Sequence, residues 1–507
     1  MKTFLAFCLL LCYGVFLRAQ NPGNQFFSDW TVHEIRFEFP QTGYWDSLKA
    51  NYLTDTYMSC EVSIDGQPYG NSGVKFKGNS SYNNQGKKKP FRIDLAEFVD
   101  DQSHDGLKKM VLNNGFKDPT LLRERLVLDF LQAHSIAAPR ASFARLYIND
   151  HYWGLYTVVE DVGKPFLEQR YGNKGGNLFK GDPKGSLTWK GTQQSLYETD
   201  YELKTNEDEN DWSDLIRYID VLNNTPAAQL ADSLEQYLNL DSWFDYWATH
   251  SLFVNLDSYV GSGHNYYLYH NTETGRFEWI TWDVNEAFGT FQMGLQASAL
   301  KTLPFTHIPQ PPQQRPMMNR MLPDPALKQA YADHLCTLLA DFSNEALDNR
   351  IDSLADLIRP FVYADTLKFY SNAQFEQNIS QDINTAGPAG GTTILGLKPF
   401  IAARRTSLYQ QLAGYGCAPV TQTTAAPADD APRLLPNPAT DQVVLESKKA
   451  GLEAATLWSA DGRRLAQWTF HGAAQTTLPL GDFPSGIFYL EITTASSVHL
   501  RRLSIVR

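Results

Sequence analysis

A change in composition near residue 418 divides this chain into two parts that fold separately. Residues 418–433, APVTQTTAAPADDAPR, are rich in Pro, Ala and Thr without a large apolar side chain, so they predict an extended linker. A chain of 507 residues is longer than one ordinary domain. Its 43% apolar and 20% charged residues are the composition of a globular protein. We therefore expect a long first domain and a short second domain at 434–507.

The N-terminus has the pattern of a secretion signal. Lys2 precedes an apolar core at 4–16, and 17–19 ends in a small residue suited to cleavage, so residues 1–19 are predicted to be a signal peptide. No later stretch reaches the roughly 20 apolar residues that a transmembrane helix requires. A net charge of −12 argues against nucleic-acid binding. The sequence thus predicts an exported protein with no transmembrane segment and no nucleic-acid partner.

Cysteine usage excludes a disulfide framework. Once the signal peptide is removed, Cys60, Cys336 and Cys417 remain, an odd number without a CxxC spacing. At most one disulfide can form, and we expect isolated, mostly buried thiols.

The second domain has the alternating pattern of a small β-sandwich. Turn signals at 460–463 and 484–486 separate short runs of strand-forming residues. The expected strands are 442–446, 455–458, 464–469, 476–479, 487–493 and 498–506.

The part before the linker has an element order typical of a protein-kinase N-lobe, followed by helices. The N-lobe elements are strands at 73–77 and 91–95, a helix at 120–134, strands at 141–148 and 153–159, and an acidic hinge at 160–161. The later helices are expected at 212–222, 227–237, 241–255, 326–339, 344–358 and 396–412. We therefore predict an α+β fold: a two-lobed, kinase-like domain followed by a small all-β sandwich domain.

Two aspartates, Asp257 and Asp283, bracket a segment whose pattern predicts a β-hairpin. Residues 264–269 are rich in strand-forming aromatics, 271–275 supply a turn, and 276–282 supply the return strand. A carboxylate before the hairpin, an amide at its start and a second carboxylate past its end can converge on one point. This is the layout of a phosphoryl-transfer site, where one Asp orients a hydroxyl while an Asn and another Asp hold a divalent metal.

Each aspartate also has a simpler interpretation. Asp283, followed by Val-Asn-Glu-Ala, fits a helix N-cap, and Asp257 fits a turn. We favour catalysis because the two occur together in this frame. Two other functions stay open: a non-catalytic surface or structural binding protein on a kinase-like scaffold, and a metal-dependent hydrolase that uses both aspartates without ATP.

Several short motifs occur in order along the first domain. They are FKGNSS at 76–81, KPFRI at 89–93, LNN at 112–114, LRE at 122–124, YIN at 147–149, GLY at 154–156, GNLFK at 176–180, HNYYLY at 264–269, WD at 282–283 and FG at 288–289. Through this series the chain resembles the spore-coat protein H (CotH) kinase family. The resemblance implies an atypical kinase domain over 20–417, with an N-lobe at about 30–160 and a C-lobe at about 161–412. It implies transfer of the γ-phosphate of ATP, with Mg²⁺ or Mn²⁺, to Ser or Thr of an exported or surface protein.

The resemblance also assigns roles to individual residues. Asp257 matches the catalytic aspartate, which accepts or orients the proton of the acceptor hydroxyl. Asp283 matches the metal-binding aspartate, with Asn265 as a second ligand, because hard Mg²⁺ or Mn²⁺ prefers such oxygen atoms. Lys77 stands where the family's motif usually has Arg, which keeps the charge but not the bidentate fork.

The nucleotide or phosphate contacts are assigned to charged residues before the hairpin. The candidates are Lys77, Lys89, Arg92, Glu124, Glu160 and Lys180. We expect a basic residue of the 89–92 strand to contact phosphate, with Glu124 on the following helix as its partner. Glu160 at the hinge either reads the nucleotide base or ends a strand. The lysine run at 87–89 alternatively forms a solvated loop.

The second domain carries its own set of ordered motifs. They are PNP at 436–438, DGR at 461–463, GIFYL at 486–490 and a basic finish at Arg507. Through them this domain resembles the C-terminal sorting domain of the type IX secretion system. The resemblance implies export through the periplasm by that machinery, to a secreted or outer-surface-attached location. An adhesive sandwich domain is the alternative.

Overall fold

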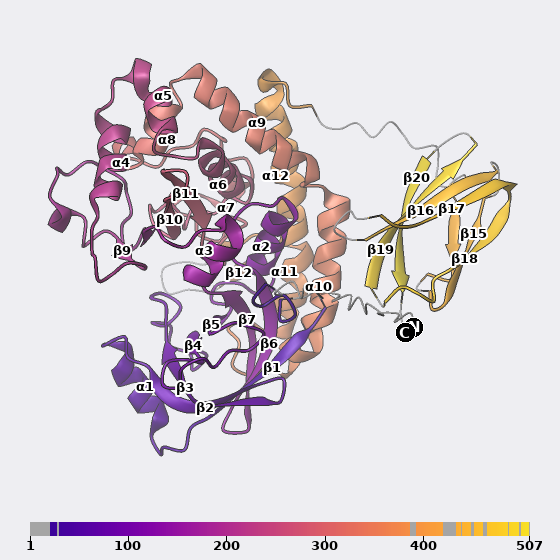
Figure 1. Cartoon of the computed structure of the whole chain (residues 1–507), viewed down its shortest axis with the longest axis horizontal. Helices are drawn as coiled ribbons and strands as arrows, with labels where there is room; N and C mark the ends of the chain where they lie inside the picture. Colours follow the sequence, from indigo (N-terminus) through magenta and orange to yellow (C-terminus); the bar gives the residue numbers. More distant parts are fainter. Residues whose placement is uncertain are drawn as a thin grey trace, which may run out of the picture. The chain divides into compact units, whose positions relative to one another are not determined.

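The computed structural model describes residues 21–27, 30–385, 392–418, 432–437, 439–447, 451–459, 464–484, 486–495 and 498–505. Its contacts divide the chain into two compact units, Met1–Pro419 and Val420–Arg507. The predicted signal peptide, most of the linker, the DGR turn and Arg507 lie outside the described residues. Both helices and strands build the larger unit and strands build the smaller one, a mixed α+β architecture (Figure 1).

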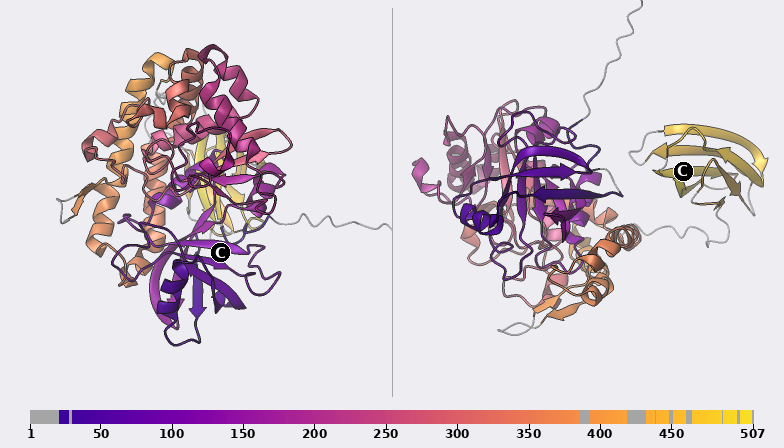
Figure 2. Two further views of the ribbon diagram at one scale, coloured as in Figure 1. Left: turned by 90° about the vertical axis from the view of Figure 1, so that its left-hand side faces the viewer. Right: turned by 90° about the horizontal axis from the view of Figure 1, so that it is seen from below.

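A closed β-barrel forms one end of the larger unit (Figures 1 and 2). Its strand order is β1-β2-β3-β4-β5-β7-β6, and β1 pairs in parallel with β6 to close it. The strands are β1 Val32–Glu38, β2 Met58–Ile64, β3 Gln67–Phe76, β4 Phe91–Asp94, β5 Lys109–Asn113, β6 Ala141–Ile148 and β7 His151–Glu160. Alternate side chains of β1 and β2 are buried, because successive residues of a strand face opposite sides. The inward side chains form an apolar core of their own.

The sequence patterns predicted part of this barrel. Strands β4, β6 and β7 lie at or close to the predicted ranges, the predicted strand at 73–77 covers only the second part of β3, and helix α2 (Arg123–Ala133) lies within the predicted helix. The β6–β7 turn at Asn149 and Asp150 has positive φ at both residues, the conformation of a type I′ hairpin. Strands β1, β2 and β5 and helix α1 (Tyr44–Tyr52) were not predicted.

The predicted hairpin is confirmed in a second sheet of the larger unit. Strands β10 (Tyr266–Asn271) and β11 (Arg276–Thr281) pair antiparallel, with Tyr266 opposite Thr281. The sheet order is β11-β10-β8-β9, with β8 at Leu178–Lys180 and β9 at Glu202–Leu203. Helix α6 (Leu240–Leu252) packs against β11, so the segment that carries Asp257 is held next to the hairpin.

Helices make up most of the rest of the larger unit; most lie beyond the barrel, while α10 also packs against barrel strand β7 (Figures 1 and 2). They are α3 Lys164–Tyr171, α4 Ser213–Asn224, α5 Leu230–Glu235, α7 Ala297–Lys301, α8 Pro316–Met321, α9 Pro325–Asp341, α10 Asn344–Ala364, α11 Asn372–Ser380 and α12 Leu397–Leu412. A short pair of strands, β12 Ile383–Thr385 and β13 Thr392–Ile394, lies between α11 and α12. The six predicted helices correspond to α4, α5, α6, α9, α10 and α12. Within the described residues, none of the helices has both the length and the apolar surface needed to span a membrane.

One cysteine prediction is wrong. Cys336 on α9 and Cys417 beyond α12 form a disulfide, whereas we expected isolated thiols. The two cysteines are separated by 81 residues, and nothing in their local sequences indicates that α9 and α12 pack together. Cys60 is a free, buried thiol on β2, as expected.

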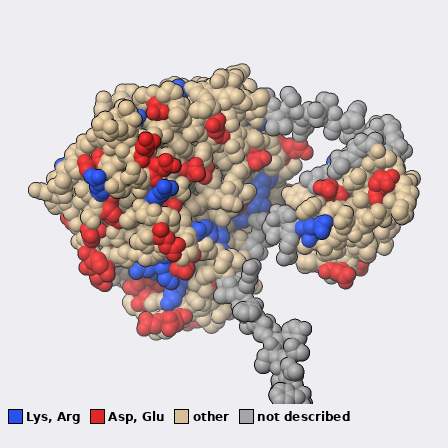
Figure 3. Space-filling model, turned by 45° about the horizontal axis from the view of Figure 1, so that its top comes forward, with Lys and Arg blue, Asp and Glu red and all other residues tan. Residues whose placement is uncertain are grey.

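Charged side chains of both signs are scattered over the surface of the larger unit seen in Figure 3. Figure 3 shows acidic and basic side chains intermixed on one face. Exposed ion pairs such as Lys49–Asp46, at 3.1 Å, stabilise little because water and salt screen them. Lys88 and Asp365 differ, since their side chains are fully buried and 2.5 Å apart. Lys88 therefore does not belong to a solvated loop, the alternative considered for the lysine run at 87–89.

The smaller unit is the predicted β-sandwich. One sheet has the order β14-β15-β18 and the other β17-β16-β19-β20, and apolar side chains from both form one core. The strands are β14 Arg433–Leu435, β15 Gln442–Glu446, β16 Leu452–Ser459, β17 Arg464–Ala473, β18 Gln475–Pro479, β19 Gly486–Thr494 and β20 Val498–Ile505. Each predicted strand is present because its period-two pattern matches a sheet that buries one face.

Candidate active site

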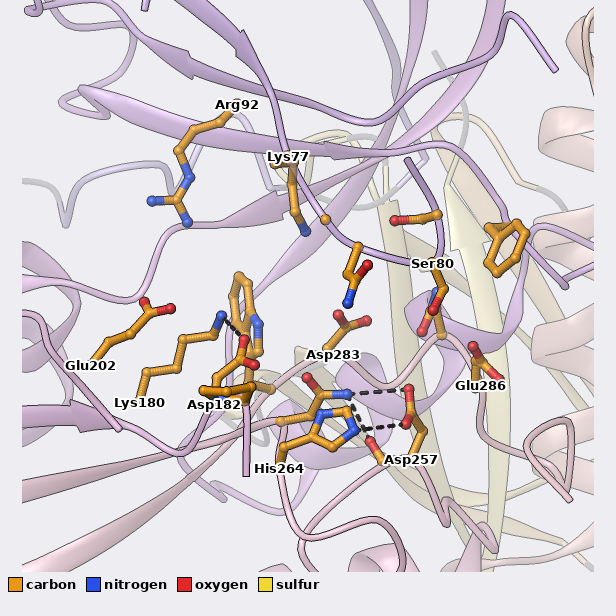
Figure 4. Close-up of a pocket in the computed structure, with 18 of the residues that line it drawn as sticks. Lys77, Ser80, Arg92, Lys180, Asp182, Glu202, Asp257, His264, Asp283 and Glu286 are labelled. Atoms are coloured by element: carbon orange, nitrogen blue, oxygen red, sulfur yellow. Dashed lines mark hydrogen bonds and ion pairs between the residues drawn. The ribbon is translucent and has the colours of Figure 1, made fainter. Parts of the chain in front are cut away.

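A pocket of about 520 Å³ lies between the barrel and the β10–β11 hairpin. Six of the predicted site residues line it: Lys77, Arg92, Lys180, Asp257, Asn265 and Asp283. Figure 4 shows Arg92, Lys180 and Glu202 at one end and Ser80 and Glu286 at the other, with Asp257 and Asp283 between them. The pocket therefore has one end that combines basic and acidic side chains and a second, distinct end, on either side of the aspartate pair.

Asp257 is held by the turn that follows α6. The amide nitrogen of Asn265 donates to the Asp257 backbone carbonyl at 2.9 Å and to its carboxylate at 3.2 Å. Asn265 has a φ of 60°, a left-handed conformation that places its side chain back toward Asp257 at some cost in strain. These contacts leave the amide oxygen of Asn265 as the atom that can bind a metal.

Asp283 follows directly on the end of β11. Its φ of 53° is left-handed, and residues 285–290 form turns rather than a helix, so Asp283 is not the N-cap that was considered as an alternative. Burial raises the pKa of its carboxyl group, and the ammonium of Lys77 opposes that shift. A desolvated carboxylate close to lysines is typical of a site that binds a metal or an anion.

Lys77, at the end of β3, is connected to Glu124 on α2 through one amide. The Lys77 ammonium donates to Asn113 Oδ1 at 3.1 Å, and Asn113 Nδ2 donates to both carboxylate oxygens of Glu124 at 2.9 Å. Burial and the nearby Asp283 raise the pKa of Glu124 to about 8. The expectation that a residue of the 89–92 strand is the partner of Glu124 is wrong, because Lys77 takes that place through Asn113.

The two basic residues of the 89–92 strand lie in different surroundings. Arg92 lines the pocket and forms an ion pair with Asp161 at 3.1 Å. Lys89 is outside the pocket lining, and its ammonium donates to the carbonyls of Tyr82 and Asn84 at 2.7 and 2.5 Å. Only Arg92 is therefore positioned to meet a ligand in this pocket.

Lys180 and Glu160 likewise differ. Lys180 lies on β8, lines the pocket and pairs with Asp182. Glu160 ends β7 outside the pocket lining, where its carboxylate pairs with Arg140 at 2.6 Å and Arg170 at 3.2 Å. Of the two roles considered for Glu160, the structure thus supports the end of a strand rather than contact with a base.

Sequence reasoning missed two features of the site. His264, within the HNYYLY motif, has its Nε2 3.3 Å from the Asp257 carboxylate. Burial lowers the pKa of His264, but bonding to Asp257 outweighs burial, so the net shift is upward. Lys117 pairs with the buried Glu286 at 2.8 Å. In the sequence, the one indication of the Lys117–Glu286 pair is that Glu286 lies three residues after Asp283.

The site provides oxygen ligands and cations but only part of a metal coordination shell. Among the described residues, no three His, Cys, Asp or Glu side chains are grouped so that they could hold a metal. Asp283 and Asn265 are an incomplete set of the kind that phosphate oxygens and water complete. The arrangement suits a substrate that brings its own phosphates to the lysines and the aspartate.

A family model described as "CotH kinase protein" matches residues 74–385. The chain belongs to the CotH kinase family. The matched range contains every site residue described above, including Lys77, Asp257 and Asp283. A second model, described as "Secretion system C-terminal sorting domain", matches residues 433–506. The smaller unit is therefore a secretion sorting domain, the kind that the type IX system handles at the outer surface of the cell.

Relatives of this CotH-family chain occur in bacteria and fungi. "Inner spore coat protein H" of Bacillus subtilis is 28% identical over 299 residues, which cover 57% of this chain and 78% of the relative. "Invasin CotH3" of Rhizopus delemar is 23% identical over 323 residues, or 58% of this chain and 52% of the relative. "Spore coat protein homolog 1" of the same fungus is 22% identical over 335 residues, or 62% and 54%. The chain thus spans about half the length of the two fungal relatives.

Proposed function

We propose that this protein is a secreted atypical kinase with a two-lobed catalytic domain. It transfers the γ-phosphate of ATP to Ser or Thr of an exported or surface protein. The observation that carries the proposal is one pocket that combines the Asp257–Asn265 pair, the desolvated Asp283 and the cations Lys77 and Lys180. Family membership supports the same reaction.

In the proposed reaction Asp257 receives the proton of the acceptor hydroxyl. The serine or threonine oxygen attacks the γ-phosphorus, the new oxygen–phosphorus bond forms, and the bond between the γ-phosphorus and the bridging oxygen of ADP breaks. The amide of Asn265 and the imidazole of His264 fix the Asp257 carboxylate. This fixed position lowers the barrier because the acceptor meets a base that is already oriented.

In the proposed complex, basic residues bind the phosphates of ATP and oxygen ligands bind the metal ion. Lys77, Arg92 and Lys180 would contact phosphate oxygens, and the Asn113 bridge to Glu124 holds Lys77 in place. Asp283 and Asn265 would hold Mg²⁺ or Mn²⁺, whose bound charge offsets the charge of the phosphates. The side-chain oxygen atoms of Asp283 and Asn265, which both line the pocket, are ligands that such an ion prefers.

The location of the proposed substrate follows from the sorting domain. The match to a secretion sorting domain supports export of this chain, and we therefore propose an exported or surface protein as the acceptor. The type IX machinery would be the partner that binds the smaller unit.

The test is transfer of radiolabelled γ-phosphate by the full chain with Mg²⁺ or Mn²⁺. Asp283→Ala should lose both labelling and metal-dependent ATP binding, whereas Asp257→Asn should lose labelling and keep ATP binding. Asp46→Ala, an exposed carboxylate on α1, is the matched control and should behave as wild type. A wild-type chain that neither binds ATP nor labels a protein would contradict the proposal. The chain would then be a binding protein on a kinase-like scaffold, or a hydrolase if it cleaves phosphoesters without ATP.

A further inference from the structure

A second cavity adjoins the candidate active site at the end away from Arg92 and Lys180. Its volume is about 420 Å³, and it is lined by Phe116, Lys117, Phe369, Tyr370, Gln374 and Thr385. Phe116 and Lys117 also line the catalytic pocket. We call this cavity the aromatic groove. Because two lining residues are shared, the groove and the catalytic pocket are neighbours.

The shared wall lies close to the catalytic aspartates. The Lys117 ammonium is 2.8 Å from Glu286, and the charges of Asp257 and Asp283 act on the Glu286 carboxyl. The same ammonium lies 5.5 Å from the ring centre of Phe116 and 5.3 Å from that of Phe291. Lys117 is therefore paired with Glu286 and lies near two rings while 36% of its side chain stays exposed, so the groove combines three aromatic side chains with one paired cation and two polar side chains.

Both walls of the groove are fixed by Lys88. The first wall, with Phe116, is held by Asn114, whose Nδ2 donates to the Lys88 carbonyl at 2.8 Å and whose Oδ1 accepts from the Phe116 amide at 3.3 Å. The second wall, with Phe369, follows Asp365, whose carboxylate binds the Lys88 ammonium at 2.5 Å. Lys88 thus joins the two walls through its backbone and its side chain.

Further contacts keep the two walls in one arrangement. Asp365 also accepts from the backbone amides of Leu155 on β7 and Leu367, at 3.1 and 2.9 Å. The rings of Phe116 and Phe369, one from each wall, contact each other edge to face with 5.9 Å between their centres. Lys117 has a φ of 60°, a left-handed conformation that is uncommon for a lysine and occurs here in a turn. These contacts connect the two loop segments that form the walls of the groove.

We propose that the aromatic groove binds the acceptor segment of the protein substrate. The groove takes an aromatic or large aliphatic side chain next to the phosphorylated Ser or Thr. This inference rests on the proposed kinase function and names the substrate class. Gln374 Oε1 accepts from the Ser371 amide at 2.9 Å, which leaves the NH₂ group of Gln374 to donate to a peptide carbonyl.

An aromatic occupant explains the features of the groove better than a phosphate or a nucleotide does. The groove has one lysine in its lining, Lys117, which is paired with Glu286. Several basic residues, Lys77, Arg92, Lys180 and Lys204, line the catalytic pocket, which favours phosphates there even though the last three are also paired with carboxylates. Stacked and edge-to-face contacts with Phe116, Phe369 and Tyr370 would favour a ring over a small or charged side chain. The volume is within the range of sites that bury small organic groups.

The test uses the full chain, labelled ATP and a set of peptides with one central Ser. Each neighbouring position carries Phe, Leu, Ala or Lys in turn. The wild type should prefer Phe or Leu over Ala and Lys at one or more positions by roughly tenfold or more in kcat/KM, the selectivity that an apolar pocket supplies. Phe369→Ala should remove this preference through a higher KM for the Phe peptide, with the Kd for ATP unchanged. Phe369→Leu should restore part of it.

The control variant is Phe98→Ala, which removes a half-exposed ring outside both cavities and should leave the preference intact. The inference is wrong if the wild type shows no preference, or if Phe369→Ala keeps it. A weaker Kd for ATP in Phe369→Ala would place the nucleotide base in the groove, which also overturns the inference.

Peptide binding without nucleotide separates the two proposals. Fluorescence anisotropy of a labelled Phe peptide should show binding to wild type and to Asp283→Ala, and weaker binding to Phe369→Ala. Peptide binding without any phosphate transfer would contradict the kinase proposal and support the groove as a peptide-binding site. Transfer without Phe369-dependent binding would leave the kinase proposal standing and refute the groove.

Discussion

Replacement of Lys88 by Met should destabilise the larger unit far more than loss of a surface lysine. The Lys88 ammonium and the Asp365 carboxylate are both fully buried and 2.5 Å apart. Lys88→Met keeps the volume of the side chain but leaves the Asp365 charge buried without its partner. Breaking a buried pair in this way costs about 3–5 kcal/mol.

The hydrogen bonds around Asp365 keep the loss of stability in Lys88→Met near the lower end of this range. When Lys88 is gone, the carboxylate still accepts from the amides of Leu155 and Leu367, and such bonds to a charged group retain part of its stabilisation. We therefore expect a loss of about 3 kcal/mol in the free energy of unfolding. Adding Asp365→Asn removes the stranded charge, so the double variant should be less destabilised than the sum of the two single variants.

The assay is urea denaturation followed by tryptophan fluorescence. Lys49→Met is the matched control, because its exposed pair with Asp46 should be worth less than about 1 kcal/mol. The reasoning is refuted if Lys88→Met costs no more than Lys49→Met, or if the single and double variants are simply additive. Either result would mean that the charge of Asp365 reaches water in the native protein.

Two further perturbations test the site and the helical part. The pKa of the Glu124 carboxyl is about 8 in the folded protein, against an ordinary value of 4.5. Between these two pH values the folded protein binds a proton that the unfolded chain does not. The stability that protonated Glu124 contributes is therefore complete below pH 4.5 and is lost as the pH rises through 8. Glu124→Gln should flatten the fall in the urea midpoint between pH 5 and 8, and an unchanged slope would refute the shifted pKa. The Cys336→Ser/Cys417→Ser variant should lose about 4 kcal/mol, because the disulfide closes a loop of 81 residues. Added reductant should lower the midpoint of wild type and not that of the variant; equal midpoints without reductant would contradict this.

Local patterns were enough to predict the hairpin and the two aspartates beside it. The aromatic strand at 264–269 and the turn before Arg276 are encoded by neighbouring residues, and Asp257 and Asp283 flank them directly. The strands of the sandwich were predicted for the same reason. In each case the residues that decide the structure lie within a few positions of one another.

Contacts between distant segments were not predictable in this way. Lys77 and Asn113 are 36 residues apart, and nothing near either one indicates that Asn113 bridges to Glu124. The lysine run at 87–89 shows the same limit: Lys88 is buried against Asp365, 277 residues away, while Lys89 binds nearby carbonyls. Burial of a lysine depends on a partner that local composition does not reveal.

The parallel pairing of β1 with β6 has a consequence for the order in which the protein folds. β1 pairs with β2 nearby, but its other edge meets β6 more than a hundred positions later, as in Val32 opposite Phe143. During synthesis or export, one edge of β1 stays unpaired until the β6–β7 hairpin has emerged. Unpaired strand edges of this kind can pair with strands of other chains. A chaperone that covers β1 during this interval would protect the barrel, and with it the end of β3 that carries Lys77.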